Sequence, residues 1–226
     1  MIIAIGVLGM GLFQTLFPIG IDETSAPLGG ILMATMPIHV VLLTLVFRLE
    51  TPSLRAIIGV VLTIGGLGII IFSANASEVV GQTTIRGILF VVLAEFGYAI
   101  HTTFLRPFMR KYPTMQVTGL AMSVSVIVYQ IVFLPDMLRI NFRAIHPIGY
   151  LTVIYSGIVA LFVANLLWNF CVRKIGSTKV SVYGNLPPVV VLILSAMLFG
   201  DLLEPLQILG SFIIFGGVVL VQLPSR

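Results

Sequence analysis

The sequence contains one stretch twice, and this internal repeat limits the possible folds more than any other feature. A shift of the chain by 151 residues, without a gap, aligns residues 33–66 with residues 184–217. The matched positions are Pro37 and Pro188, Glu50 and Asp201, Gly59 and Gly210, Gly65 and Gly216, and Gly66 and Gly217. Self-similarity over this length indicates two copies of one structural unit.

The composition places both copies in a lipid bilayer. Hydrophobic residues make up 58% of the 226 residues and charged residues only 9%, whereas soluble domains carry about 25% charged residues. A helix bundle in lipid needs apolar side chains on its outside as well as in its core, which fits this balance. The basic residues are scattered in short connectors without forming a patch, so no nucleic-acid partner is expected.

Apolar runs of about 20 residues, the length needed to cross the hydrocarbon core, recur along the chain. Backbone groups in lipid must be bonded within their own segment, so each run is expected to be a helix. The eight predicted membrane-spanning helices are residues 1–20, 27–47, 54–73, 84–105, 115–135, 147–170, 179–199 and 204–223. The predicted fold class is therefore an all-α integral membrane protein.

Arginine and lysine predict the orientation of this bundle, because positively charged connectors tend to stay in the cytoplasm. With Met1 inside, nine basic residues lie on the cytoplasmic side and three lie outside. The nine are Arg48, Arg55, Arg106, Arg110, Lys111, Arg173, Lys174, Lys179 and Arg226, and the three are Arg86, Arg139 and Arg143. We expect a multi-pass protein of the cytoplasmic membrane with a cytoplasmic C-terminus.

This topology makes the two copies inverted relative to each other. Residues 54–73 would cross outwards and their copy, residues 204–223, inwards, an arrangement common among secondary transporters. An inverted pair needs an odd number of helices in each unit. Residues 84–226 supply five helices and residues 1–75 supply three, with an extracytoplasmic linker at 76–83. The predicted inverted-repeat bundle thus has 3 + 5 helices of a 5 + 5 plan, without the first two.

The motifs shared by the two copies carry a family resemblance. In the first copy they are Thr24-Ser25-Ala26, Pro37, Glu50, Gly59 and Gly65-Gly66; in the second they are Leu167-Trp168-Asn169, Pro187-Pro188, Asp201, Gly210 and Gly216-Gly217. Together they resemble the EamA family of the drug/metabolite transporter superfamily, whose members have two five-helix repeats. Asp201 departs from the glutamate usual in the family. A homodimer, or a partner chain that supplies the two further helices, is an open alternative.

Glu95 is the only carboxylate in the interior of a predicted span, and it lies at the centre of residues 84–105. An acid at this depth costs at least about 2.5 kcal/mol unless it is neutral or faces a polar cavity. Helical spacing puts Tyr98 and Thr102 on the same face as Glu95. We predict a substrate-binding or proton-coupling role for Glu95 and Tyr98. The structural alternative for Glu95 is a protonated or hydrogen-bonded packing residue.

Amide and aromatic residues form a second candidate face. Asn165, Trp168 and Asn169 stand at positions i, i+3 and i+4 of one predicted helix. The repeat aligns Gln14 with Asn165. Amide faces related by inversion suit a pathway between the repeats, so these four residues are predicted to contact substrate. Ordinary hydrogen bonding between helices is the alternative.

Prolines inside two predicted spans indicate breaks in the helices. Pro37 and Pro188 each lack a backbone donor and leave the carbonyl four residues earlier without its partner. Tyr183 and Asn185 stand beside the second break and are predicted site residues, because a substrate could reach the freed backbone groups there. His39 is a further candidate, since an imidazole can relay protons or bind a ligand.

Other sequence features have structural interpretations. Glu50 and Asp201 stand near predicted helix starts, where an acid complements the helix dipole. The repeated glycines are expected to permit close helix packing. The HExxH, GxSxG and Walker motifs are missing, as is any His/Cys cluster with metal spacing, so no enzyme activity, metal or cofactor is expected.

The predicted function is an EamA-type membrane transporter. It would move a small metabolite or xenobiotic, amino-acid-like or amphipathic, across the cytoplasmic membrane by alternating access, with proton-coupled export as one option. Its expected partners are this small-molecule substrate and the lipid bilayer. Two alternatives stay open: a truncated, non-transporting fragment or partial subunit, and an intramembrane enzyme that modifies lipid.

Overall fold

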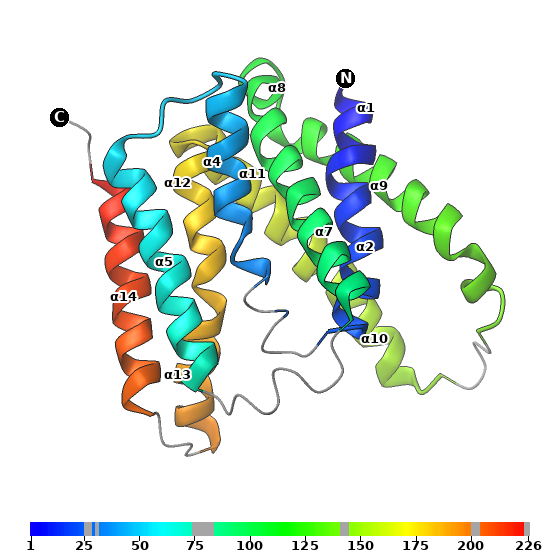
Figure 1. The fold of residues 1–226 in the computed structure, drawn as a ribbon. Coiled ribbons are helices and arrows are strands. Elements are labelled where there is room, and N and C mark those ends of the chain that lie inside the picture. Colours follow the sequence, from blue (N-terminus) through cyan, green and yellow to red (C-terminus); the bar gives the residue numbers. More distant parts are fainter. Residues whose placement is uncertain (25–28, 30–31, 74–83, 141–144, 200–203, 224–226) are drawn as a thin grey trace.

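The protein is a bundle of helices (Figure 1). The computed structural model describes residues 1–24, 29, 32–73, 84–140, 145–199 and 204–223, and all regular elements in these ranges are helical. Five helices within them are long and apolar enough to cross a membrane: Ile2–Asp22, Ile85–Lys111, Thr114–Met137, Pro147–Ile175 and Pro205–Gln222. The prediction of an all-helical membrane bundle is confirmed.

The first repeat contributes three helical segments. Its first segment runs continuously through α1 (Ile2–Ile5), the π-helical η1 (Gly6–Gly11) and α2 (Leu12–Asp22). The next two are α4 (Met36–Val46) and α5 (Leu54–Ser73). The predicted linker at 76–83 and the beginning of the predicted span 27–47 lie outside the described residues.

The second repeat contributes five segments. The first two are α7 (Ile85–Phe104), which is followed by the short α8 (Arg106–Lys111), and α9 (Thr114–Met137). The third is formed by α10 (Pro147–Tyr155), π-helical η3 (Ser156–Val163) and α11 (Ala164–Ile175). The last two are α12 (Ser177–Ser181) with 3₁₀-helical η4 (Val182–Asn185) and α13 (Pro187–Phe199), and then α14 (Pro205–Gln222).

The two repeats share element boundaries as well as sequence. Helices α4 and α13 begin at Met36 and Pro187, and α5 and α14 begin at Leu54 and Pro205, so both pairs are separated by the 151-residue shift. The π-helical segments η1 and η3 also fall at overlapping repeat positions. Figure 1 shows α5 running away from the end of the bundle that holds Met1, and α14 running towards it. The copies are therefore inverted, as predicted.

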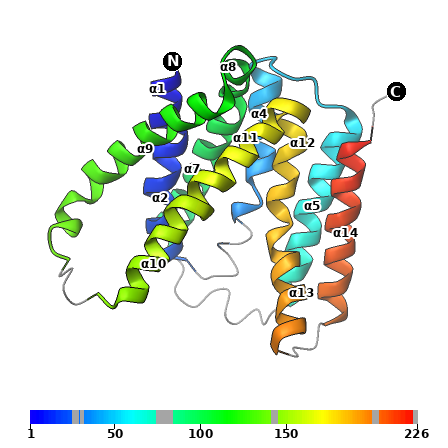
Figure 2. The same ribbon diagram turned by 180° about the vertical axis from the view of Figure 1, so that it is seen from behind.

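One end of the bundle is strongly basic. The start of α1, the ends of α4 and α11 and the starts of α5 and α12 all lie at this end (Figures 1 and 2). We call it the basic end and define it by Arg48, Arg55, Arg106, Arg110, Lys111, Arg173, Lys174 and Lys179. The grouping of these residues matches the topology expected from the sequence.

Helices α5 and α14 cross in close contact through four glycines. A Cβ added at Gly59 would lie 2.6 Å from the backbone oxygen of Gly217, and one at Gly217 would lie 2.7 Å from that of Gly59. The same reciprocal contact joins Gly66 to Gly210, at 2.7 Å and 2.6 Å. Gly59 thus packs against the repeat counterpart of Gly66, and Gly66 packs against the repeat counterpart of Gly59. Only a residue without a side chain fits at these four positions.

Two of the six repeated glycines do not serve this contact. A Cβ added at Gly65 or Gly216 would meet nothing within 4 Å. The expectation that these two permit close packing is therefore wrong, because each stands one residue out of phase with the face of its helix that makes the crossing.

The prolines of the two predicted breaks start helices rather than bend them. Pro37 lies in the first turn of α4, and Pro187 and Pro188 open α13. The first turn of a helix has no intrahelical acceptor for its N–H groups, so proline costs little there. Short turns precede both helices, with Thr35 N–H bonded to Leu32 O at 3.1 Å. The predicted breaks therefore exist, and these prolines stand directly after them.

Candidate functional site

Helix α7 brings a row of polar side chains into the centre of the bundle. It starts at a Thr84 N-cap, whose hydroxyl accepts from Gly87 N–H, and it packs against α2 and α4. We call the polar side chains that α7, α9 and α11 place together the buried polar cluster. Its members are Tyr98, His101, Thr102, Thr118, Asn165, Trp168 and Asn169.

Hydrogen bonds join the three helices within this cluster. Asn169 Nδ2 donates to Thr118 Oγ1 at 2.9 Å and lies 3.5 Å from His101 Nε2. Trp168 Nε1 donates to Thr102 Oγ1 at 3.2 Å. Asn169, Thr118, His101 and Thr102 are fully buried. Polar side chains in an apolar bundle must find partners in this way, and the bonds fix α11 against α7 and α9.

The rings of Phe13, Tyr98 and Trp168 form an aromatic layer, and Tyr98 and Trp168 are also members of the cluster. The ring of Tyr98 is 4.9 Å from that of Phe13 on α2 and 5.9 Å from that of Trp168 on α11, measured between centroids. The Tyr98 hydroxyl also points to Asn165 Oδ1 at 3.4 Å. The layer therefore spans from the first repeat, through α7, to α11.

A cavity of about 430 Å³ lies on the side of this layer that faces away from the basic end. It is lined by Phe13, Gln14, Phe17, Pro18, Val126, Tyr129 and Leu161. Gln14 and Phe17 follow Phe13 along α2, which runs away from the basic end (Figure 1). Leu161 precedes Asn165 on a helix that runs towards the basic end. The lining is mostly aromatic and aliphatic with one amide, which is typical of a site for an amphipathic ligand.

Glu95 lies one helical turn before Tyr98. Its side chain is only 3% exposed, and among the described residues its carboxylate has no hydrogen-bond partner. An isolated carboxylate in such surroundings is expensive in its charged form. A substrate-binding or proton-coupling role for Glu95 stays a prediction, beside the alternative of a protonated packing residue.

The structure separates the other predicted site residues from one another. Gln14 lines the cavity, while His39 on α4 contacts the ring of Phe96 edge-on, with centroids 5.6 Å apart. Asn185 Nδ2 donates to Thr63 Oγ1 of α5 at 3.0 Å, so this amide faces the glycine-packed helices and not the cluster. Tyr183 is half-exposed in η4. The roles of these residues remain predictions.

His101 and Thr118 belong to the buried polar cluster and were not predicted from the sequence. His101 stands three residues after Tyr98, and this helical spacing places both side chains on one face of the helix. The sequence could therefore have indicated His101. Thr118 lies on α9, which has no repeat counterpart within the chain. Only the packing of α9 against α11 brings it to Asn169.

The site holds no set of ligands suited to a metal ion. Within the described ranges, no three His, Cys, Asp or Glu side chains lie close enough to bind one. The free Cys171 is exposed on α11. The described side chains of the site can form hydrogen bonds and aromatic contacts, and Glu95 adds a carboxyl group.

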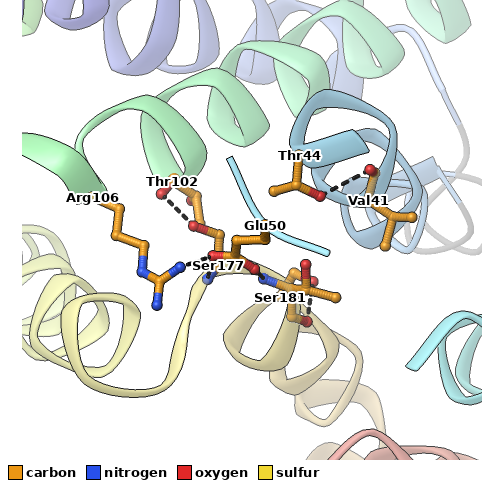
Figure 3. A network of polar contacts seen from close by, with 8 residues as sticks. Val41, Thr44, Glu50, Thr102, Arg106, Ser177 and Ser181 are labelled. Carbon is orange, nitrogen blue, oxygen red and sulfur yellow. Dashed lines mark hydrogen bonds and ion pairs between the residues drawn. The ribbon is translucent and has the colours of Figure 1, made fainter. Parts of the chain in front are cut away.

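A second polar network occupies the basic end (Figure 3). Glu50 forms an ion pair with Arg106 Nη1, and its carboxylate accepts from Ser177 N–H at 2.7 Å and from Thr178 N–H at 3.2 Å. Ser177 Oγ donates to Thr102 O at 3.1 Å. Glu50 was expected to complement the start of the next helix along the chain; instead it caps α12 of the other repeat. Asp201, its counterpart, lies outside the described residues.

Replacing Asn169 with leucine should lower the free energy of unfolding by about 0.6–1.7 kcal/mol, the range measured for hydrogen bonds between membrane helices. Leucine keeps most of the volume but leaves Thr118 and His101 without the amide. Titration of the purified protein with a denaturing detergent measures the change. Cys171→Ser, two residues away and exposed, is the control and should shift the value by less than about 0.5 kcal/mol. Equal shifts in both variants would contradict the assignment.

Comparison with known proteins gives one family for nearly the whole chain. The sequence signature of the EamA-like transporter family matches residues 1–72 and 85–223. An uncharacterized transporter of Archaeoglobus fulgidus is 25% identical over 221 residues, which cover 97% of this chain and 76% of the relative. A probable terminal-alkyne amino-acid exporter of Streptantibioticus cattleyicolor is 24% identical over 224 residues, covering 98% and 72%.

The fold is also similar to that of solved proteins. One crystal structure superposes with a TM-score of 0.79 at 16% sequence identity, and the match covers 97% of this chain and 75% of the other. At this identity the similarity speaks for the architecture alone.

Proposed function

The chain belongs to the EamA-like transporter family, and on this premise we propose that it carries a small amphipathic or amino-acid-like molecule across the cytoplasmic membrane by alternating access. That it is a membrane transporter of the drug/metabolite type follows from the family and from relatives named as transporters. Its substrate, mechanism and coupling are the proposal. We take the chain to be a carrier rather than a lipid-modifying enzyme.

The observation that carries the proposal is the position of the cavity between elements of both repeats. Phe13 and Gln14 come from the first repeat, while Val126, Tyr129 and Leu161 come from the second. Sites between inverted repeats become accessible from either side when one repeat rocks against the other. The aromatic lining suits the apolar part of a substrate, and Gln14 its polar part.

Unpaired polar atoms in the buried polar cluster support a polar substrate group. Asn169 Oδ1 and His101 Nδ1 are buried and have no partner among the described residues. Buried polar atoms are costly without a hydrogen bond, so a ligand that bonds them gains affinity. The description of one relative as a probable terminal-alkyne amino-acid exporter agrees with a substrate that carries polar groups.

Transport by purified protein tests the proposal directly. The protein would be reconstituted into liposomes and offered a panel of amino acids and hydrophobic amines, with empty liposomes as the control. We expect saturable uptake of at least one amphipathic amine or amino acid. If no compound of either class is moved, the proposed substrate class is wrong.

The orientation proposal places the basic end in the cytoplasm, as the positive-inside rule predicts. In a Cys171→Ser background, cysteine at Thr51 would mark the basic end and cysteine at His146 the opposite end; both positions are exposed. Intact cells treated with a membrane-impermeant maleimide should label the His146 position, and the Thr51 position should react only after the cells are permeabilised. The reverse pattern would contradict the proposal.

A second candidate is a subunit that needs further helices. Segment η1 buries Gly6, Gly9, Met10 and Gly11 under α7 and α9, whereas its counterpart η3 and the preceding α10 bury no residue. A helix pair equivalent to α7 and α9 would cover that face, supplied by a second copy or by a partner chain. Inactivity of the chain alone, together with disulfide crosslinking of an Ile158→Cys variant in membranes, would favour this candidate.

A further inference from the structure

The contacts of Glu50 join the two repeats at one end of the bundle (Figure 3). We call Glu50, Arg106, Ser177 and Thr178 the Glu50 latch. Glu50 follows α4 in the first repeat, and its three partners begin α8 and α12 in the second. We propose that this latch is the gate that holds the basic end closed and that its release opens this end during transport. The inference rests on the proposed carrier function.

The backbone on both sides of the latch is shaped to bring the partners together. Arg48, two residues before Glu50, has φ 52°, the only positive φ of a non-glycine residue in the described ranges. Gly176, directly before Ser177, has φ 100°. A Cβ at Gly176 would lie 3.2 Å from Glu50 Oε1. The positive φ of Arg48 belongs to the turn that ends α4, in which Leu49 N–H bonds to Thr44 O at 2.9 Å. Glycine adopts the φ of Gly176 without strain, so both turns can bring their side of the latch into place.

The latch is better sheltered than the other ion pair described in the chain. The side chains of Arg106 and Glu50 are 17% and 14% exposed, while Arg86 in the Arg86–Glu23 pair is 66% exposed. Exposed ion pairs contribute little, because water screens them. In the latch, both carboxylate oxygens are hydrogen-bonded. Removal of the Glu50 charge would leave Arg106 unpaired among the other cations of the basic end.

The rest of the structure is consistent with a gate at this end. The cavity lies on the side of the aromatic layer that faces away from the basic end. The cavity and the latch are therefore on opposite sides of this layer. Helix α12 is tied to α14 of its own repeat, because Lys179 Nζ donates to Gln222 O at 3.3 Å and Gln222 Nε2 donates to Lys179 O at 3.0 Å. Release of Glu50 would leave these two bonds in place, so α12 would part from Glu50 while it stays attached to α14.

Cysteine accessibility tests the gate without a substrate. Ser181 is fully buried on α12, one turn beyond Ser177. In a Cys171→Ser background reconstituted in nanodiscs, Ser181→Cys would be exposed to a membrane-impermeant maleimide. Glu50→Gln should raise its labelling rate by at least about tenfold, which corresponds to about 1.4 kcal/mol in the closed-to-open equilibrium. Arg106→Gln, which breaks the latch from the other repeat, should have the same effect.

Matched controls separate release of the latch from unfolding. Glu23→Gln removes the exposed pair at the opposite end and should leave the Ser181→Cys rate within about twofold. Val60→Cys, buried among α5 and α14, should stay unlabelled in every variant. Labelling of Val60→Cys in the Glu50→Gln protein would assign the effect to unfolding and overturn the proposal. An unchanged Ser181→Cys rate in both latch variants would also overturn it.

The same measurements distinguish the latch from the carrier function. Spin labels at Thr51→Cys and Lys174→Cys, both exposed at the basic end, should report longer distances in Glu50→Gln than in the parent. Neither readout requires transport. Substrate uptake with unchanged labelling would leave the carrier function standing and remove the latch, while faster labelling without uptake would leave the gate and remove the proposed substrate class.

Discussion

Alanine at Gly59 is expected to lower the free energy of unfolding by roughly 1–3 kcal/mol, the usual cost of an added methyl group in a close-packed interface. The new Cβ would lie 2.6 Å from Gly217 O and 2.4 Å from Val221 Cγ2. The carbonyl is part of helix α14 and cannot rotate away, so α5 and α14 must separate. Titration with a denaturing detergent, followed by circular dichroism, measures the loss.

Gly65→Ala provides the matched control, on the same helix and six residues away. An added Cβ there meets nothing within 4 Å, and alanine is about 1 kcal/mol more favourable than glycine in a helix interior. The control should therefore leave stability unchanged or raise it, and Gly216→Ala should behave likewise. If Gly59→Ala and Gly65→Ala destabilise equally, helix propensity and not the crossing explains the glycines.

Glu95→Gln is expected to abolish accumulation of substrate driven by a pH gradient. A gradient of two pH units supports up to about 100-fold accumulation when one proton is exchanged for each substrate molecule. Glutamine has nearly the same shape but cannot take up or release a proton, so accumulation should fall to about onefold while downhill exchange continues. Uptake into reconstituted liposomes, with and without the imposed gradient, measures both quantities.

Glu23→Gln is the control for the loss of a carboxylate. Glu23 lies at the end of the bundle in an exposed ion pair with Arg86 and should leave accumulation unchanged. Proton-dependent accumulation that survives in Glu95→Gln would remove Glu95 from coupling. Loss of downhill exchange as well would assign Glu95 to substrate binding.

The repeat made much of the architecture predictable. The 151-residue shift anticipated that α4 and α5 would match α13 and α14, because sequence period and helix boundaries follow the same unit. The placement of Asn165, Trp168 and Asn169 on one face of a helix was also predictable from their spacing. Helical spacing fixes which residues share a face, and Asn165 and Trp168 both contact Tyr98.

Contacts between distant segments were not predictable from one sequence. Glu50 bonds to Ser177 across 127 positions, and nothing in the local pattern around Glu50 distinguishes this partner from the start of α5. Asn185 likewise stands beside a helix break, as expected, but its amide turns towards Thr63 on α5. In both cases the packing of one repeat on the other, and not local spacing, decides the direction of the side chain.

The two π-helical segments determine the direction in which the amides of Gln14 and Asn165 point. Leu12 N–H reaches back five residues to Val7 O, and Ala164 N–H likewise to Val159 O. Each residue of an α-helix advances by about 100°, so one residue accommodated in a wide turn rotates the remainder of the helix by that angle. Gln14 and Asn165 come directly after these turns, one in each repeat. Both amides therefore point inwards because each repeat has a π-helical turn at the same position. Deletion of one residue from either π-helical segment would rotate the helix that follows and turn its amide towards the lipid.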